Sequence, residues 1–524
     1  MNLLKAMATV AGMTGLSRIA GFVRDMMTAA ILGAGPVADA FFIALKLPNL
    51  FRRITAEGAF SVSFVPLYSK TIEDEGEEEA ARFAGNAFSV MFLILSVFTI
   101  LAVIFMPYML YAIAPGFADD PVRYNLSVEF SRVSFPYLLL MSLTALLGGV
   151  MNAHHRFAPF AFVPTLFNLS LIAALLLNSY FPTPGHALSW GLLAAGFLQL
   201  GFLWASMKRA RLHIVIARPR LDKKIRKVFH LMGPGLVGAG VVQINLFFDI
   251  MIASFLGEGA ISYLYYADRL NQLPLGVVGI AVGTALLPLL SRALARAEKD
   301  GHDNGEARDL FNRALEYCLI LALPASAALA VIPLTLITVL FERGAFTAAD
   351  SQVTAMILAC YAIGLPAYIT TKVFSTVHWA RHDTKTPVKI SIVGVLSNIL
   401  VAVSLAPLIG VTGIALATGL TAWIQYVMHV RAVRKYPQAN LDDRFLRNLP
   451  KIVAATCIMA ASLFILATLL EEWVIGAPSV YRFTALAGLV LAGGAVYAAG
   501  VLTMGVLRVK DLKRLIKRSN EQGS

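Results

Sequence analysis

The sequence predicts an all-α polytopic membrane protein with about fourteen transmembrane helices. The 524 residues are 58% hydrophobic and only 14% charged, whereas soluble domains carry about 25% charged residues. Apolar runs of roughly 20 residues, the length needed to cross the bilayer core, recur along the chain. Lys and Arg cluster in the short connections between these runs, so the net charge of +13 indicates membrane topology and not nucleic-acid binding.

Each predicted helix is an apolar run long enough to cross the membrane, and the longer runs are expected to tilt, kink or project from it. In chain order the runs cover residues 3–32, 37–69, 83–113, 126–152, 158–180, 187–207, 227–256, 260–293, 309–334, 351–377, 386–405, 411–433, 447–470 and 482–506.

The connections between the runs alternate between two compositions. One set is rich in Lys and Arg and comprises 208–227, 291–308, 380–385, 431–447 and 508–518. The other set is poor in them and comprises 33–36, 115–123, 179–186, 257–259, 406–410 and 471–482. By the positive-inside rule the first set faces the cytoplasm. An even number of helices then places both termini in the cytoplasm.

The chain also resembles itself at an offset of 224–230 residues. The matched pairs are ILGAG (31–35) with FLGEG (255–259), Gly116/Phe117 with Gly344/Phe346, Phe135-Pro136 with Leu365-Pro366, Asn168 with Asn398, and Gln199 with Gln425. This ordered series predicts two six-helix lobes, 1–224 and 225–445, then two further helices in 446–507 and a basic cytoplasmic tail in 508–524. Because six is an even number of crossings, the two lobes form a parallel repeat.

The first predicted helix carries charge at membrane depth. Its segment SRIAGFVRD contains Arg18, Arg24 and Asp25, and each such charge costs roughly 2.5–3.5 kcal/mol on insertion scales. Arg18 and Asp25 are seven residues apart and share one face of an ideal helix, while Arg24 points elsewhere. These residues need either a compensating partner or a function.

The second predicted helix carries a stripe of charge. Asp39, Lys46, Arg53 and Glu57 recur at spacings that place them on one side of the helix, and Arg52 points away from it. A kink is expected between Lys46 and Arg52, because Pro48 removes a backbone donor.

The eighth helix adds Asp268 and Arg269, and mutual neutralisation is one explanation of the whole set. The pairs would be Arg18–Asp25, Arg53–Glu57 and Asp268–Arg269. The charges do not balance, however, because five arginines and Lys46 face four acids, and lipid-facing arginines are rare. We therefore predict a water-filled cationic cavity lined by the first, second and eighth helices, suited to an anionic, phosphorylated substrate.

Enzymatic and cation-transport functions fit the sequence less well. No Walker A motif and no Ser/His/Asp or metal-ligand constellation stands out, so neither a catalytic residue nor a metal or other cofactor is predicted. A membrane enzyme should present an acid/base or metal cluster at one membrane face. A drug or cation antiporter should carry cavity acids without this arginine surplus. Asp249 is a lone acid in the seventh helix, either a cation or proton site or the partner of an arginine.

Several long motifs carry a resemblance to a known family. The opening MNLLKAMATVAGMTGLSRIAGFVRD, then GAGPVADAFFIALKLPNLFRRITAEGAFSVSFVPLYS, APGF (114–117), YYADRLNQLPLGVVGIAVGTALLPLLS (265–291) and ERGAFT (342–347) closely resemble the MurJ (MviN) lipid II flippases of bacteria. These proteins belong to the multidrug/oligosaccharidyl-lipid/polysaccharide exporter superfamily. The likeness runs along essentially the whole chain.

The resemblance implies a function for the charged residues. Such proteins move lipid II, an undecaprenyl-pyrophosphoryl disaccharide-pentapeptide, from the inner to the outer leaflet of the cytoplasmic membrane by alternating access, for cell wall synthesis. The family's functional arginines match Arg18, Arg24, Arg52, Arg53 and Arg269, and its functional acids match Asp39 and Glu57. We predict that Asp39 and Glu57 hold the arginines in ion pairs while the cavity is empty, and that an arriving pyrophosphate competes with them for the arginines.

The resemblance leaves other properties open. Helices 13 and 14 are expected to form a groove for the lipid tail. The energy source is left among Na⁺, H⁺ and the membrane potential, because the further acid expected near Asn398 for a sodium site is not evident. The expected partners are lipid II, membrane lipids and the cell-wall synthesis machinery. The alternative is an exporter of another polyprenyl-pyrophosphate-linked saccharide, or of drugs, coupled to a cation gradient.

Overall fold

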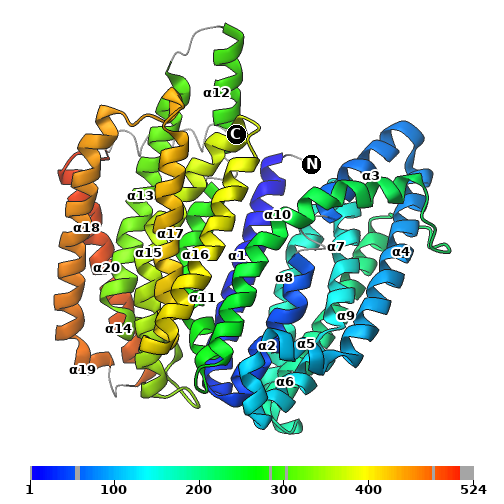
Figure 1. The fold of residues 1–524 in the computed structure, drawn as a ribbon, viewed down its shortest axis with the longest axis horizontal. Helices are drawn as coiled ribbons and strands as arrows, with labels where there is room; N and C mark the ends of the chain where they lie inside the picture. Colours follow the sequence, from blue (N-terminus) through cyan, green and yellow to red (C-terminus); the bar gives the residue numbers. More distant parts are fainter. Residues whose placement is uncertain (1–2, 54–59, 282–285, 301–304, 475–477, 508–524) are drawn as a thin grey trace. The chain divides into compact units, whose positions relative to one another are not determined.

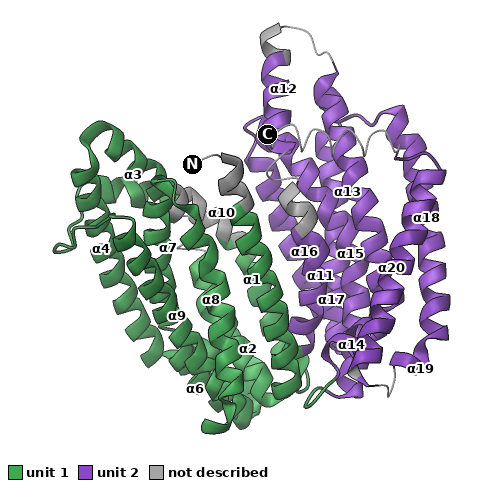
Figure 2. Cartoon of the chain, turned by 180° about the vertical axis from the view of Figure 1, so that it is seen from behind, with its two compact units in different colours: residues 1–262, 343–346 green, residues 263–342, 347–524 purple. Residues whose placement is uncertain are grey.

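The fold is built from α-helices, with short 3₁₀ turns at three of the connections in the described part of the chain. The computed structural model describes residues 3–53, 60–281, 286–300, 305–474 and 478–507. The chain forms two compact units: residues 1–262 with 343–346, and residues 263–342 with 347–524 (Figure 2). Each unit is described by itself below.

The first unit contains the helices up to α10 and the first turn of α11 (Figure 1). Its elements are α1 (Leu3–Leu32), α2 (Pro36–Arg52), α3 (Ser61–Glu75), α4 (Glu77–Ile104), α5 (Met106–Ile113), η2 (Pro115–Asp119), α6 (Pro121–Ser134), α7 (Tyr137–Ala153), α8 (Phe157–Leu176), η3 (Asn178–Tyr180), α9 (Pro184–Arg209) and α10 (Lys223–Ser254).

The second unit contains the rest of α11 and the helices that follow. Its elements are α11 (Ala260–Ala281), α12 (Leu287–Asp300), α13 (Glu306–Val331), α14 (Pro333–Phe341), α15 (Ala348–Ala380), α16 (Lys385–Ile409), α17 (Val411–Val433), η5 (Pro437–Ala439), α18 (Asp443–Leu469), α19 (Glu471–Val474) and α20 (Ser479–Thr503). Helices α18 and α20 pack on each other, and α18 also packs on α13. The predicted lipid-tail groove between α18 and α20 stays a prediction.

The described residues of the predicted apolar runs are almost all helical, but some runs are broken in two. Proline accounts for two of the breaks, because it lacks the N–H that continues a helix: Pro107 lies in the first turn of α5, and Pro136 precedes α7. Ten helices of the described part are long and apolar enough to cross a membrane. The protein is therefore a multi-pass membrane protein, while the count of fourteen crossings stays a prediction.

The packing boundary between the units differs from the predicted lobe boundary. It follows Ser262 and not residue 224, because α10 packs on α3, α5 and η2 of the first unit. This boundary tests neither the predicted lobes nor the parallel repeat, and both stay predictions.

Two loops that match in the proposed repeat make matching contacts. The backbone of Gly116 lies against Ser254 at the end of α10, and the backbone of Gly344 lies against Ala30 near the end of α1. A Cβ atom at Gly116 would approach the Ser254 carbonyl carbon to 2.4 Å, and one at Gly344 would approach the Ala30 oxygen to 2.2 Å. Gly344 also has a φ of 59°, so glycine is required there on two grounds.

The opposite end of the first unit gathers the predicted basic connection 208–227. Lys224 Nζ lies 2.9 Å from Glu75 Oε2 and 3.5 Å from Glu79 Oε1. The backbone N–H of Val215 donates to the Ala81 carbonyl at 3.1 Å. Lys224 thus ties this connection to the acidic residues where α3 meets α4.

Candidate functional site

Arg24 lies at the centre of a buried polar network between α1 and α8. Its Nε and Nη2 donate to Asp25 Oδ1 at 3.1 and 2.6 Å, and its Nη1 donates to Asn168 Oδ1 at 2.8 Å. Asn168 Nδ2 in turn donates to the Ser17 carbonyl at 2.9 Å. The guanidinium also lies 5.4 Å from the ring centre of Phe167. Side chains of both α1 and α8 therefore accept hydrogen bonds from the Arg24 guanidinium.

Arg18 lies on the same helix in an opposite environment. It is exposed, whereas the side chains of Arg24 and Asp25 keep only 8% and 6% of their accessible surface. The ion pair of Asp25 is with Arg24 and not with Arg18, which corrects the first of the three pairings considered from sequence. Seven residues of helix separate Arg18 from Asp25 by about 10 Å, while Asn168 holds the neighbouring Arg24 in place.

Asp39 is fully buried and caps the first turn of α11. Its Oδ2 accepts from the Gly259 N–H at 2.8 Å, and its Oδ1 accepts from the Ser262 N–H at 2.9 Å and the Ser262 hydroxyl at 2.6 Å. Free N–H groups at a helix start favour a carboxylate. The predicted pairing with arginines is thus replaced by hydrogen bonds to a helix N-terminus.

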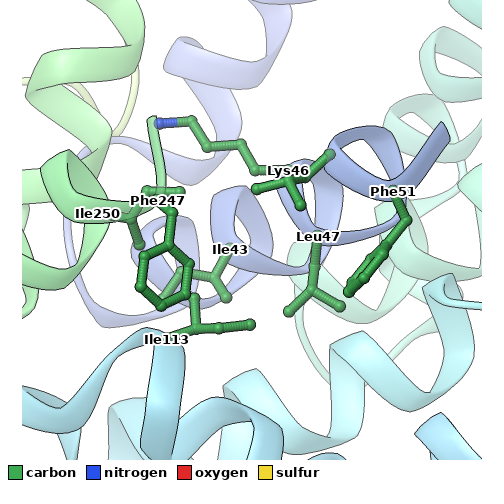
Figure 3. Close-up of a pocket in the computed structure, with 8 residues that line it drawn as sticks. Ile43, Lys46, Leu47, Phe51, Ile113, Phe247 and Ile250 are labelled. Atoms are coloured by element: carbon green, nitrogen blue, oxygen red, sulfur yellow. The ribbon is translucent and has the colours of Figure 1, made fainter. Parts of the chain in front are cut away.

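The charged stripe of α2 runs from buried to exposed. Lys46 is half-buried, and its aliphatic chain lies over a small cavity of about 70 Å³ lined by Ile43, Phe247 and Ile250, among others. Figure 3 shows the amine pointing away from the apolar side chains below it. A long cationic side chain can cover apolar surface in this way while its charge stays in a polar environment.

The end of α2 presents two arginines with different surroundings. Arg52 Nε donates to Asn49 Oδ1 at 3.0 Å, whereas Arg53 is exposed. The helix continues through Pro48 to Arg52. Glu57, the last residue of the predicted stripe, lies outside the described residues.

The two charged residues of α11 belong to the second unit. The Arg269 guanidinium lies 4.4 Å from the ring centre of Tyr265, a cation–π contact. Asp268 accepts a hydrogen bond from Gln272 on the next turn of the same helix. The predicted cavity shared with the first and second helices stays a prediction.

Asp249 on α10 is half-buried and accepts from Asn245 Nδ2 at 3.3 Å. No group of three or more His, Cys, Asp or Glu residues able to hold a metal ion occurs among the described residues. The proposal of a cation or proton site at Asp249 is therefore neither supported nor contradicted by its surroundings.

Sequence reasoning missed the uncharged residues that hold these charges. Asn168 was noticed only as a repeat match and not as the ligand of an arginine, and the hydroxyl of Ser262 was not noticed at all. A polar residue in an apolar helix is the signal that could have found Asn168.

A second buried network was also missed. Glu316 on α13 is fully buried and is bound by Arg313, by Arg444 at 3.4 Å and by Asn448 at 2.9 Å. Arg313 also pairs with Asp442, which caps α18. This network fixes one end of α18 to α13.

Comparison with protein families gives one match along most of the chain. The family model described as lipid II flippase MurJ matches residues 28–484. A protein of Rhizobium meliloti named probable lipid II flippase MurJ is 41% identical over 100% of this chain and 98% of its own length. A protein of Burkholderia cenocepacia named lipid II flippase MurJ is 33% identical over 88% of this chain and 89% of its own length.

Solved structures agree with these matches. A structure described as lipid II flippase MurJ, inward closed conformation, superposes with a TM-score of 0.77 at 25% identity, covering 94% of this chain and 97% of that one. An inward-facing multidrug resistance MATE family transporter of the MOP superfamily gives a TM-score of 0.68 at 12% identity, covering 80% and 96%. The second likeness concerns the fold alone.

Proposed function

This chain belongs to the MurJ family of lipid II flippases, and on that premise we propose that it carries lipid II from the inner to the outer leaflet of the cytoplasmic membrane by alternating access. A head group with a pyrophosphate and a disaccharide-pentapeptide cannot cross about 30 Å of hydrocarbon unaided. The family match over nearly the whole chain carries this proposal.

The arginines of the membrane helices are proposed to bind the pyrophosphate. Arg18 and Arg53 are exposed and Arg24 is held by Asp25; Arg52 and Arg269 complete the set. A guanidinium makes bidentate contacts with phosphate oxygens, which a lysine cannot reproduce. This chemistry supports an anionic cargo and not the cationic cargo of a drug antiporter.

Asp25 is proposed to act as the internal competitor for Arg24. In the absence of cargo its carboxylate accepts two of the guanidinium hydrogen bonds. An arriving phosphate would displace the carboxylate. It would then stabilise one of the two states of the alternating-access cycle more than the other, as a ligand must do to shift a conformational equilibrium. The sequence placed this role on Asp39 and Glu57, but the hydrogen bonds of Asp39 now favour Asp25.

The orientation and the chemistry of the process complete the proposal. Both termini face the cytoplasm by the positive-inside rule. The protein transports lipid II without altering it covalently, with Na⁺, H⁺ or the membrane potential as the energy source. The cell-wall synthesis machinery is the expected protein partner.

Depletion of the protein in its own cells tests the function. Lipid II should accumulate chemically intact and on the cytoplasmic leaflet, and the wild-type chain should restore growth. Arg18→Ala should fail to restore growth at equal protein level, whereas Arg431→Ala on α17, which also replaces an exposed arginine, should succeed. Accumulation of an earlier precursor would instead assign the protein to biosynthesis.

Cysteine labelling tests the orientation. Labels at Tyr180 and Val480, which are 82% and 71% exposed, should react in intact cells. A label at the exposed Lys208 should react only after permeabilisation. Reaction of Lys208→Cys in intact cells would reverse the orientation.

A further inference from the structure

The connection between α9 and α10 is clamped along the surface of α4. Asn86 Nδ2 donates to the Arg220 carbonyl at 2.9 Å and to Asp222 Oδ2 at 2.8 Å, and its Oδ1 accepts from the Arg220 N–H at 2.8 Å. The Val215 N–H donates to the Ala81 carbonyl at 3.1 Å. Gly85 permits this approach, because a Cβ there would lie 1.8 Å from the Val215 oxygen. The segment is thus fixed at both ends.

The middle of this segment and α4 enclose a groove of about 380 Å³. Its walls are apolar and come from Phe88, Phe92 and Leu93 of α4 and from Ile216, Ala217 and Pro219 of the segment. The apolar side chains remain accessible, with Phe92 50%, Leu93 51% and Ile216 55% exposed. Helix α4 is long and apolar enough to cross a membrane, and an accessible apolar face on such a helix suits contact with lipid.

The same segment carries a surplus of positive charge. Residues 208–227 contain nine Lys or Arg and one acid, Asp222. The Asp222 carboxylate accepts from Asn86 and from the Ile225 N–H, and among the described residues it forms no ion pair with Arg218 or Arg220. Arg218 and Arg220, on either side of Pro219, are exposed.

We propose that this groove binds one anionic phospholipid, with an acyl chain against Phe88, Phe92 and Ile216 and the headgroup phosphate on Arg218 and Arg220. An apolar groove open to lipid and bordered by arginines matches the two ends of a phospholipid. Basic clusters beside membrane helices attract anionic headgroups, and Arg is suited to phosphate geometry. The inference is independent of the transported substrate, because it concerns the outer surface of the first unit.

Native mass spectrometry of the full-length protein with titrated lipid tests this proposal. The wild type should bind phosphatidylglycerol in preference to phosphatidylcholine with the same acyl chains. R218Q/R220Q should weaken phosphatidylglycerol binding on the order of 30-fold and leave phosphatidylcholine binding unchanged. The matched control K208Q/R209Q removes two charges at the end of α9 and should retain the wild-type affinity.

Two further arms test the apolar half of the site and the source of the phosphate. S89W places a large ring in the groove, which Ser89 also lines, and should weaken phosphatidylglycerol binding while the arginines remain. Excess glycerol 3-phosphate should not displace the lipid. Equal affinity in R218Q/R220Q and the wild type, an equal loss in K208Q/R209Q, unchanged binding in S89W, or displacement by glycerol 3-phosphate would each overturn the proposal.

Discussion

Arg18 and Arg24 lie on one helix, less than two turns apart, yet they differ in almost every physical respect. Arg24 is buried and has donors directed at Asp25 and Asn168, whereas Arg18 is exposed. A buried charge is costly to leave unpaired, and an exposed charge contributes little to stability. Two arginines with the same proposed ligand therefore differ in how much they contribute to the fold.

The same contrast recurs on α2. Asp39 at one end is fully buried and bound by three hydrogen bonds, while Arg53 at the other end is exposed. The buried charges that stabilise the fold form hydrogen bonds with groups on neighbouring helices. We expect cargo to bind at the charges that remain accessible. The following variants separate the two classes, beginning with the largest expected effect on stability.

Arg24→Ala should lower the free energy of unfolding by about 3–5 kcal/mol, because it removes the guanidinium from the buried Asp25. The double variant Arg24→Ala/Asp25→Ala should recover part of the loss, since no buried charge is then left without its partner. Thermal unfolding in detergent measures both. A single variant as stable as the wild type would show that the network does not stabilise α1 against α8.

Asp39→Asn should cost about 1–3 kcal/mol, because one carboxylate oxygen becomes an NH₂ group that faces a backbone donor. The control is Asp119→Asn, an exposed acid at the end of η2, which should be neutral. The same unfolding measurement applies, together with lipid II binding. If Asp39→Asn loses binding but not stability, Asp39 is a ligand and not a cap.

Arg18→Ala should change stability by no more than about 0.5 kcal/mol, as exposed substitutions do, but should abolish growth in the depleted strain. Arg18→Lys should restore growth only in part, because lysine keeps the charge and loses the bidentate geometry. Normal growth with Arg18→Ala at wild-type protein level would remove this arginine from the proposed site.

The smallest effect is expected at Asp383, in the connection between α15 and α16. Hydrogen bonds from Thr386 hold the pKa of its carboxyl at about 2, below the usual 3.8. A lowered folded-state pKa stabilises the protein above pH 3.8, and this contribution is lost as the pH falls towards 2. Asp383→Asn should therefore flatten the stability profile between pH 4 and 2. His378 Nδ1 lies 3.2 Å from Asp383 Oδ2, so the profile is also expected to change where this histidine titrates. An unchanged profile between pH 4 and 2 would contradict this assignment.

The positions of the helices could be predicted from the sequence, and the partners of their charges could not. A sufficiently long apolar run predicts a helix regardless of which other helices pack against that run. The predicted run 3–32 therefore corresponds to α1. The partner of Arg24 depends on which face of α8 meets α1, and only the packed structure shows Asn168 there. Helical spacing favoured a pair between Arg18 and Asp25, because spacing considers one helix alone and takes no account of the helices that pack against it.

The predicted run 37–69 contains both α2, which ends at Arg52, and α3, which begins at Ser61. Residues 54–59 between them lie outside the described residues. The buried network around Glu316 was missed because it depends on which face of α13 meets α18. Arg444 and Asn448 approach Glu316 from α18, and the apolar pattern of a single helix does not predict that contact.

The contact between Gly344 and the end of α1 has a consequence for how the chain is made. The Ala345 N–H donates to the Ala30 carbonyl at 2.8 Å. The ribosome must therefore add more than 300 residues after Ala30 before this contact of α1 can form. At roughly 5–20 residues per second, that interval is on the order of 15–60 s. During this time the first helix resides in the membrane with this backbone position uncovered. A nascent chain stopped before residue 343 should thus be far more sensitive to protease near Ala30 than one stopped a few residues beyond Phe346.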